Sequence, residues 1–290
     1  MKCVSPWLGY LVTGSLLTIL PQSALAEPVF EPAIAQVEQP VDITAVDFAQ
    51  HFQDLGIEGS ILIYALQGDG QGPASEGDRT YQHNPERNTT PFLPASTFKI
   101  LNSLIALETG VIANDLAILT WDGVERSIPA WNRDLNLRIA FNISAVWFYQ
   151  VLARRVGHER MQQWVAEVGY GNQTIGSTED IDSFWLSGDI RITPEEQVQF
   201  LQRLYNNNLP FSERAIATVK DIMIVEQTPD YTIRAKTGWA LQGNIGWYVG
   251  YVEQGENVYF FATNIDIPDE EYLGARLEVT RRSLETLGLL

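Results

Sequence analysis

The chain is poor in the side chains that hydrolases use to bind metals or to attack a substrate through a thiol. Its single cysteine, Cys3, lies at the N-terminus, so the rest of the chain has no disulfide, thiol nucleophile or cysteine ligand. The three histidines, His51, His83 and His158, do not follow the short spacings of metal sites. We therefore expect no metal site, and a Ser-His-Asp triad only if one histidine meets a serine in the folded chain.

Basic residues are also scarce. The 290 residues include 19 Lys and Arg against 36 Asp and Glu, which gives a formal net charge of −17 at pH 7. A surface of this sign repels nucleic acid and anionic lipid headgroups, so we expect neither as a partner. The 45% hydrophobic content indicates an ordinary globular protein held together by its core. The oligomeric state stays open.

Long apolar stretches are missing except at the N-terminus. Lys2 precedes an apolar stretch over 7–20, followed by Pro21 and a small-residue site that ends at Ala26. This layout predicts a secretory signal peptide, residues 1–26. The alternative is a retained membrane anchor, but the apolar stretch is short for spanning a bilayer and is interrupted. We expect export to the periplasm or the medium, with no stable membrane insertion after cleavage.

The order of the expected elements indicates an α+β fold. A lead-in without periodicity, residues 27–46, precedes one folded domain over 47–290. Expected strands lie at 60–65, 81–83, 231–236, 245–253 and 258–265, helical patterns fill about 96–226, and a last helix covers about 273–287. We predict a central antiparallel sheet built from both chain ends, flanked by helices, with a large and mostly helical insertion.

Several helix boundaries carry clear signals. Thr193 and Glu196 have capping-box spacing with Pro194 between them, and Ser212 opens another helix. Glycines that indicate helix ends follow at Gly110, Gly157 and Gly169.

One lysine lies where an apolar helix leaves little room for a charge. Ser96 and Lys99 are three residues apart, so on a helix that begins near Ala95 their side chains share a face. A helix start favours acidic side chains, and apolar residues cover most of this helix, so neither capping nor solvent exposure explains Lys99. Burial and the helix end both lower a lysine pKa. The pattern predicts a neutral amine, able to act as a base beside the Ser96 hydroxyl or to add carbon dioxide as a carbamate.

A second motif gives this pair a context. Lys236-Thr237-Gly238 lies at the end of an expected strand, and Ser-x-x-Lys with Lys-Thr-Gly occurs in serine β-lactamases and penicillin-binding proteins. No Ser-Asp-Asn follows; Ser144-Ala145-Val146 stands in the middle, with Tyr170-Gly171-Asn172 and Phe184-Trp185-Leu186 further on. With these motifs the chain resembles class D, oxacillinase-type β-lactamases over about 60–287.

The resemblance implies a set of catalytic roles. Ser96 is the expected nucleophile, and Lys99 the expected N6-carboxylated base, with carbon dioxide or bicarbonate as the only added group. The resemblance further implies that Trp185 donates its indole N–H to the carbamate, and that Ser144 relays a proton to the leaving nitrogen. Lys236 completes the expected catalytic set.

The resemblance also implies a binding site for a small β-lactam substrate. Lys236, Thr237 and Arg276 are expected to bind the carboxylate, which suits a local cationic site on an acidic protein. The backbone N–H groups of Ser96 and Trp239 are expected to form the oxyanion hole. The remaining expected substrate-binding residues are Trp131 at the cleft entrance, Val146 and Leu186 around the carbamate, and Gly238.

Two other functions share these motifs. A β-lactam-sensing receptor domain is acylated without turnover, but the expected signal peptide argues against a tethered sensor. A peptidoglycan DD-peptidase is the other alternative, which the missing Ser-Asp-Asn and the Trp185-Leu186 pair disfavour. The sequence therefore predicts a hydrolase of penicillin-type antibiotics.

Overall fold

The computed structural model describes residues 42–43, 46–66 and 79–290. The predicted signal peptide over 1–26 and most of the predicted lead-in over 27–46 lie outside the described residues. Within the part that is described, no helix has the length and apolar character needed to cross a membrane.

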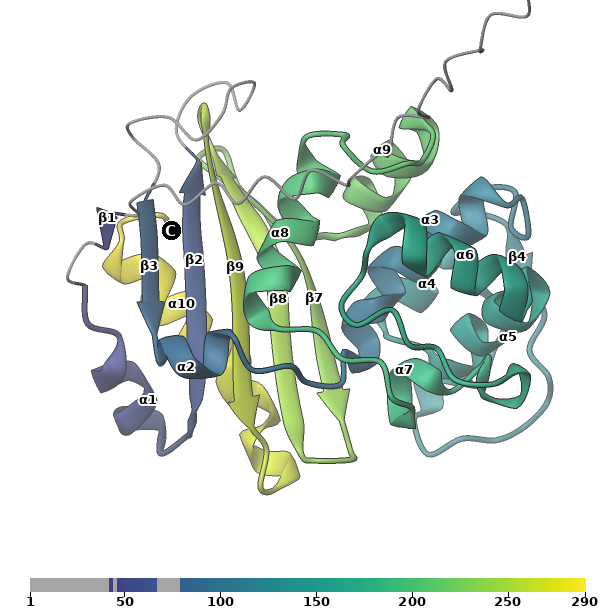
Figure 1. The fold of residues 1–290 in the computed structure, drawn as a ribbon, viewed down its shortest axis with the longest axis horizontal. Helices are drawn as coiled ribbons and strands as arrows, with labels where there is room; N and C mark the ends of the chain where they lie inside the picture. The colour runs from purple at the N-terminus through teal and green to yellow at the C-terminus, as the bar shows by residue number, and fades with distance from the viewer. Residues whose placement is uncertain (1–41, 44–45, 67–78) are drawn as a thin grey trace, which may run out of the picture. The chain divides into compact units, whose positions relative to one another are not determined.

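A seven-stranded sheet in the order β1-β3-β2-β9-β8-β7-β6 forms the centre of the fold (Figure 1). Only β1 is parallel to its neighbour, and every other pairing is antiparallel. β2 from the first part of the chain pairs along its whole length with β9 from the last part, which confirms the predicted sheet built from both ends. The strands are β1 (Asp42–Ile43), β2 (Gly59–Leu66), β3 (Arg79–His83), β6 (Ile224–Gln227), β7 (Thr232–Ala240), β8 (Ile245–Gln254) and β9 (Asn257–Asp266).

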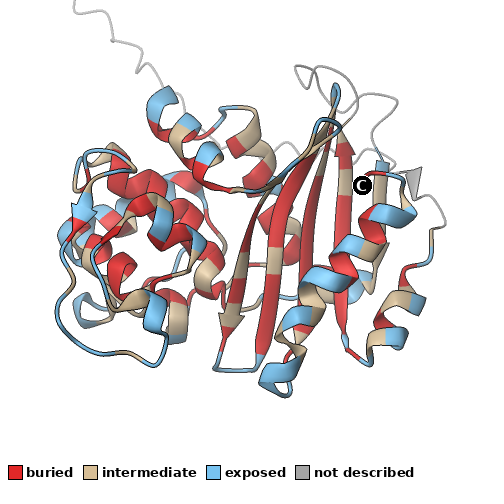
Figure 2. Ribbon diagram, turned by 180° about the vertical axis from the view of Figure 1, so that it is seen from behind, coloured by how far each residue is buried: buried red, intermediate tan, exposed pale blue. Residues whose placement is uncertain are grey.

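Alternation along the strands divides the core between the two faces of the sheet. In β8, Trp247 and Val249 pack into the larger core under the helical insertion, while Tyr248 packs into the smaller core on the other face. α1 (Ala49–Leu55) and α10 (Ala275–Thr286) cover the smaller core, as Figure 2 shows from behind.

The helical insertion covers the other face and extends beyond the edge of the sheet (Figure 1). Its α8 packs against β2, β8 and β9, and α3 lies among the remaining helices. The insertion and the segment before it comprise α2 (Pro85–Asn88), the 3-10 turn η1 (Ala95–Phe98), α3 (Lys99–Glu108), β4 (Ile118–Leu119), η2 (Pro129–Trp131), β5 (Leu135–Asn136), α4 (Leu137–Asn142), α5 (Val146–Val156), α6 (His158–Val168), η3 (Thr178–Asp180), α7 (Phe184–Ser187), α8 (Pro194–Tyr205) and α9 (Glu213–Ile222); η4 (Glu270–Gly274) precedes α10.

The helix boundaries agree with the sequence in most places. Thr193 forms the predicted capping box with Glu196, Ser212 caps α9, and Gly169 ends α6 with φ +66°. Several details differ from the prediction. The stretch expected to be helical over about 96–226 contains the paired strands β4 and β5 and ends in strand β6. The helix near Ala95 begins as the tighter turn η1, and Lys236-Thr237-Gly238 lies within β7, which continues to Ala240.

Candidate active site

Ser96 and Lys99 meet at the junction of η1 and α3. Lys99 Nζ lies 2.6 Å from Ser96 Oγ, so the amine and the hydroxyl are within hydrogen-bond distance. Ala95, just before the serine, has φ +49°, a left-handed conformation that is unusual for a residue other than glycine. The sharp turn presents Ser96 Oγ to the first residue of α3, and this places a hydroxyl beside an amine.

Lys99 is fully buried, as its apolar surroundings predict. Burial, and next the positive charge of Lys236, hold the pKa of Lys99 well below its usual value. The Tyr149 ring lies 5.3 Å from Nζ. Both effects favour the neutral amine, the form that can accept a proton from a hydroxyl.

Contacts from distant segments hold the Ser96 turn from behind. Thr97 Oγ1 donates to Pro94 O at 2.7 Å and accepts from Gln197 Nε2 of α8 at 2.8 Å. Gly238 of β7 lies so close that a Cβ there would be 3.1 Å from Pro94 O and from Thr97 Cγ2. Gln197 and Thr97 were not identified from sequence, because only the folded chain brings together residues a hundred positions apart.

Ser144 occupies a position that usually requires glycine. Its φ is +57°, its N–H donates to Phe141 O, and the N–H of Ala145 donates to Ala140 O at 2.9 Å. These bonds are the Schellman motif that closes a helix, here α4, with Ser144 as the left-handed residue. Its Oγ is buried without a hydrogen-bond partner among the described residues.

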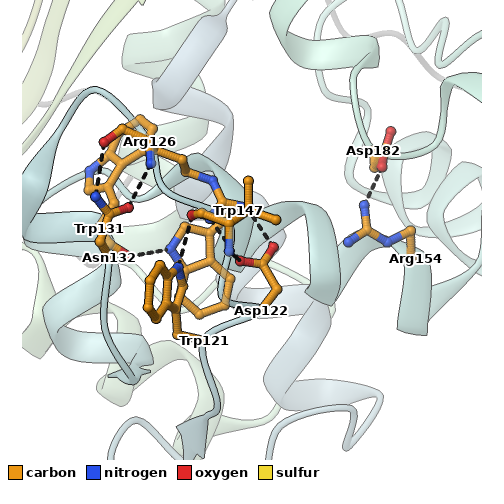
Figure 3. Close-up of polar contacts among 9 residues, drawn as sticks. Trp121, Asp122, Arg126, Trp131, Asn132, Trp147, Arg154 and Asp182 are labelled. Carbon is orange, nitrogen blue, oxygen red and sulfur yellow. Dashed lines mark hydrogen bonds and ion pairs between the residues drawn. The ribbon is translucent and has the colours of Figure 1, made fainter.

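Trp185 is also buried with an unpartnered polar atom. Its ring is fully buried and stacks on Phe98 at 5.7 Å between centroids. Arg154 of α5 forms an ion pair with Asp182, just before α7, which ties the segment that carries Trp185 to α5 (Figure 3). The indole N–H of Trp185 has no acceptor within the described part of the chain, and a buried donor without an acceptor needs an explanation.

Lys236 of β7 lies within electrostatic range of Arg276 of α10. Lys236 is 4% exposed, and its Nζ donates to Thr237 O at 3.1 Å and to Thr237 Oγ1 at 3.3 Å. Burial, followed by the charge of Arg276, lowers the pKa of Lys236 to about 7. Burial lowers the pKa of Arg276 to about 10, and its Nε and Nη1 have no partner among the described residues. Together, the buried Lys236 and the half-buried Arg276 are suited to bind a carboxylate.

A small cavity of about 140 Å³ adjoins Lys236. Lys236 and Thr237 form one side of it, while Phe141, Val225 and Leu277 supply apolar walls. Since Val225 and Leu277 are 50% and 41% exposed, the cavity has an apolar rim. Lys236 therefore has an apolar neighbour large enough for a small substituent.

Trp131 lies in the entrance loop, residues 121–134, which runs beside the start of α5 (Figure 3). It is half-buried, and its indole N–H donates to Ile143 O at 3.0 Å. Val146 begins α5, Leu186 lies in α7 and Trp239 in β7, and all three are half-buried. The roles of these residues and of Gly238 toward a substrate stay predictions.

The three histidines are engaged away from this site. His51 Nε2 lies 2.9 Å from Thr286 Oγ1, His158 Nε2 lies 2.8 Å from Gly176 O, and His83 stacks on Phe52. No group of His, Cys, Asp or Glu within the described ranges could hold a metal ion. Among the described residues, the only histidine hydrogen-bonded to a hydroxyl group is His51, and its partner is a threonine. The Ser96–Lys99 pair is therefore the stronger candidate for nucleophilic chemistry.

Comparison with known proteins points to one family. Residues 63–285 match the penicillin binding protein transpeptidase domain. β-Lactamase OXA-48 of Klebsiella pneumoniae is 46% identical over 207 residues, which cover 71% of this chain and 77% of that protein. The probable β-lactamase YbxI of Bacillus subtilis is 36% identical and covers 79% of this chain and 81% of its own length.

Solved structures agree. The class D β-lactamase YbXI from Nostoc is 58% identical and superposes with a TM-score of 0.80, covering 84% of this chain and 100% of that one. The class D β-lactamase FUS-1 of Fusobacterium nucleatum is 37% identical with a TM-score of 0.78, covering 84% of this chain and 98% of that one.

Proposed function

The chain belongs to the class D β-lactamases, within the penicillin binding protein transpeptidase domain family, and we propose from its site geometry how it performs serine β-lactamase hydrolysis. The observation that carries the proposal is the fully buried Lys99 amine at 2.6 Å from Ser96 Oγ. The proposed substrates are penicillin-type β-lactams.

Binding begins with the substrate carboxylate. Lys236 and Arg276 attract it electrostatically, and the Thr237 hydroxyl offers a hydrogen bond. In an acidic protein these two cations give the site the opposite sign from the overall charge of −17. The cavity lined by Val225 and Leu277 accepts apolar substituents of the bicyclic substrate.

Acylation then opens the β-lactam ring. Ser96 Oγ attacks the ring carbonyl while the Lys99 side chain accepts its proton. Backbone N–H groups of Ser96 and Trp239 stabilise the oxyanion, at roughly 3–4 kcal/mol for each donor. The carbonyl–nitrogen bond breaks, and Ser144 relays the proton from Lys99 to the ring nitrogen. The product is an ester on Ser96, with Lys99 again free to accept a proton.

Deacylation uses the same groups in a second cycle. A water molecule attacks the ester carbon, Lys99 again accepts the proton, and Ser96 Oγ is released with its hydrogen restored. Val146 and Leu186 limit the access of water to Lys99.

We further propose that Lys99 is carboxylated by carbon dioxide. A carbamate would supply an anionic base that works at neutral pH. The site suits it, since Lys99 has a strongly lowered pKa, and both Trp185 Nε1 and Ser144 Oγ are buried without partners within the described part of the chain. Trp185 would donate to the carbamate and hold it in place.

The test is steady-state hydrolysis of a penicillin, in degassed buffer and with added bicarbonate, by the unaltered protein and by Lys99→Ala. We expect turnover that bicarbonate raises, and loss of turnover in the variant. Mass spectrometry of the trapped intermediate should place the added mass on Ser96. Stoichiometric acylation without turnover would indicate a β-lactam sensor, and unchanged turnover by Lys99→Ala would exclude Lys99 as the base.

Export is part of the same proposal, because β-lactams act outside the cytoplasmic membrane. Residues 1–26 have the layout of a signal peptide. N-terminal sequencing of the protein recovered from outside the cytoplasm should begin at Glu27, and an intact Met1 would contradict cleavage.

A further inference from the structure

The Ser144 turn, residues 143–146, has a conformation that its own residues do not favour. Ser144 has φ +57°, whereas the left-handed position of a Schellman motif is usually glycine. A conformation of this kind persists only when surrounding contacts impose it. The direction of Ser144 Oγ depends on this backbone, so the contacts that impose it also aim the hydroxyl.

Trp131 of the entrance loop is hydrogen-bonded to Ile143, the first residue of this turn, and to Trp147, the residue that follows it. Its indole N–H donates to Ile143 O at 3.0 Å, directly before Ser144. Its own carbonyl accepts from Trp147 Nε1 at 2.8 Å, directly after Val146 (Figure 3). One residue is thus hydrogen-bonded to the chain on either side of Ser144.

The bond from Trp131 gives the carbonyl of Ile143, at the C-terminal end of α4, a hydrogen-bond donor. Ile143 is the last half-helical residue of α4, and the carbonyls at a helix end lack partners within the helix. With Ala140 O and Phe141 O already used by the Schellman bonds, Trp131 supplies the donor for the next carbonyl in the turn. The indole therefore completes the turn that carries Ser144.

The entrance loop is itself braced, so Trp131 is a fixed support. Asn132 Oδ1 accepts from Arg126 N and Asn132 Nδ2 donates to Arg126 O, both at 2.9 Å. Both oxygens of Asp122 accept from the Arg126 guanidinium, which lies 5.6 Å from the centre of the Trp147 ring (Figure 3). These contacts tie the loop to the residue that holds the Trp131 carbonyl.

We propose that Trp131 is a positioning residue for proton transfer, which acts through Ser144 by holding the Ser144 turn in its left-handed conformation. The inference rests on the proposed role of Ser144 and adds to it a structural cause. A role at the cleft entrance accounts for an aromatic ring at this position, but it leaves unexplained why the indole N–H is directed at Ile143 O. The small displacements that matter in catalysis are of the kind that loss of one such bond permits.

A double-mutant cycle tests the proposal. Trp131→Phe keeps an aromatic ring and removes the N–H, and Ser144→Ala removes the group that the N–H is proposed to aim. Trp121→Phe is the matched control, because Trp121 Nε1 donates to Val124 O at 3.1 Å, so this indole hydrogen bond stays within the entrance loop. Acylation rates and KM are measured for each variant, with thermal unfolding to record stability.

We expect Trp131→Phe to slow acylation about tenfold with little change in KM, which is the size of one lost hydrogen bond. In the Ser144→Ala background the same change should have no further effect, and Trp121→Phe should leave acylation unchanged in both backgrounds. Equal losses from Trp131→Phe in both backgrounds, or a loss seen only in KM, would overturn the proposal. Absence of hydrolysis by the unaltered chain contradicts the proposed function instead, so the two failures are distinguishable.

Discussion

The starts of α8 and α3 differ in almost every feature that stabilises a helix. α8 has a capping box between Thr193 and Glu196, a proline at its first position and acidic residues in its first turn. α3 follows a 3-10 turn, has no side-chain cap and no acidic residue in its first turn, and begins with the buried Lys99. Acidic groups stabilise a helix N-terminus and cations destabilise it, so α3 begins with the unfavourable charge type.

The difference separates stability from chemistry. The capping box of α8 supplies hydrogen-bond partners for the backbone N–H groups at its start. Gln197, the residue after Glu196, donates to Thr97 Oγ1 in the turn that carries Ser96. The stable helix start thereby supports the unstable one. We expect substitutions near Ser96 to reduce activity while stability is kept or raised, and substitutions at the start of α8 to do the opposite.

Lys99→Met should have the largest effect, a fall in kcat of about 10⁴-fold, at the upper end of what loss of a general base costs. Stability should rise in carbonate-free buffer. Between the lowered native pKa of Lys99 and its unfolded value of 10.5, the unfolded chain binds the extra proton, so unaltered protein gains stability as pH increases. The stability of the variant should not rise with pH in this way. Its free energy of unfolding should therefore exceed that of the unaltered protein most at the low-pH end of that window. Chemical unfolding at several pH values measures the difference. A less stable variant at pH 7 would show that the amine is not destabilised by burial.

Ser144→Gly should lower kcat about 10²-fold, since a proton relay is lost. Its stability should be equal or up to about 1 kcal/mol higher, because glycine adopts the left-handed conformation without a Cβ clash. Ser144→Ala is the control, with the same loss of activity and no gain from relief of strain. Equal melting temperatures for the two variants would contradict strain at this residue.

The pH dependence of substrate capture should follow Lys236. Its pKa of about 7 means that the ammonium is lost as pH rises above 7, and kcat/KM for an anionic penicillin should then fall about tenfold per pH unit. A bound carboxylate stabilises the ammonium and so raises the pKa of Lys236 in the complex. The corresponding decrease in kcat should therefore occur at higher pH than the decrease in kcat/KM. Lys236→Arg should abolish these decreases, because arginine stays charged. A decrease that persists in this variant would assign it to another group.

Thr193→Ala should have the smallest effect on catalysis. Loss of an N-cap hydroxyl costs about 1 kcal/mol of stability, with kcat unchanged because Pro194 and the rest of α8 still place Gln197. Urea unfolding and steady-state kinetics on the same preparation measure both quantities. A drop in kcat larger than the drop in folded fraction would show that the start of α8 also tunes the Ser96 turn.

Much of this arrangement could be predicted from local sequence. Alternation and helical periodicity predicted the sheet from both ends, and the apolar residues around Lys99 predicted its burial. The left-handed Ser144 could not be predicted, since serine does not favour that conformation. Contacts from Gln197 to Thr97 and from Trp131 to Ile143 O also left no signal, because they join side chains to distant segments and follow no periodicity.

The pairing of β2 with β9 has a consequence for how the enzyme acquires activity. Helices form from local contacts within microseconds, but joining strands from opposite ends of a chain first requires closure of a long loop. β7, which carries Lys236, packs against the η1 turn with Ser96 only after it has entered the sheet beside β8. During refolding, helical circular dichroism should therefore recover before hydrolysis does, and the delay measures the time the sheet needs to close.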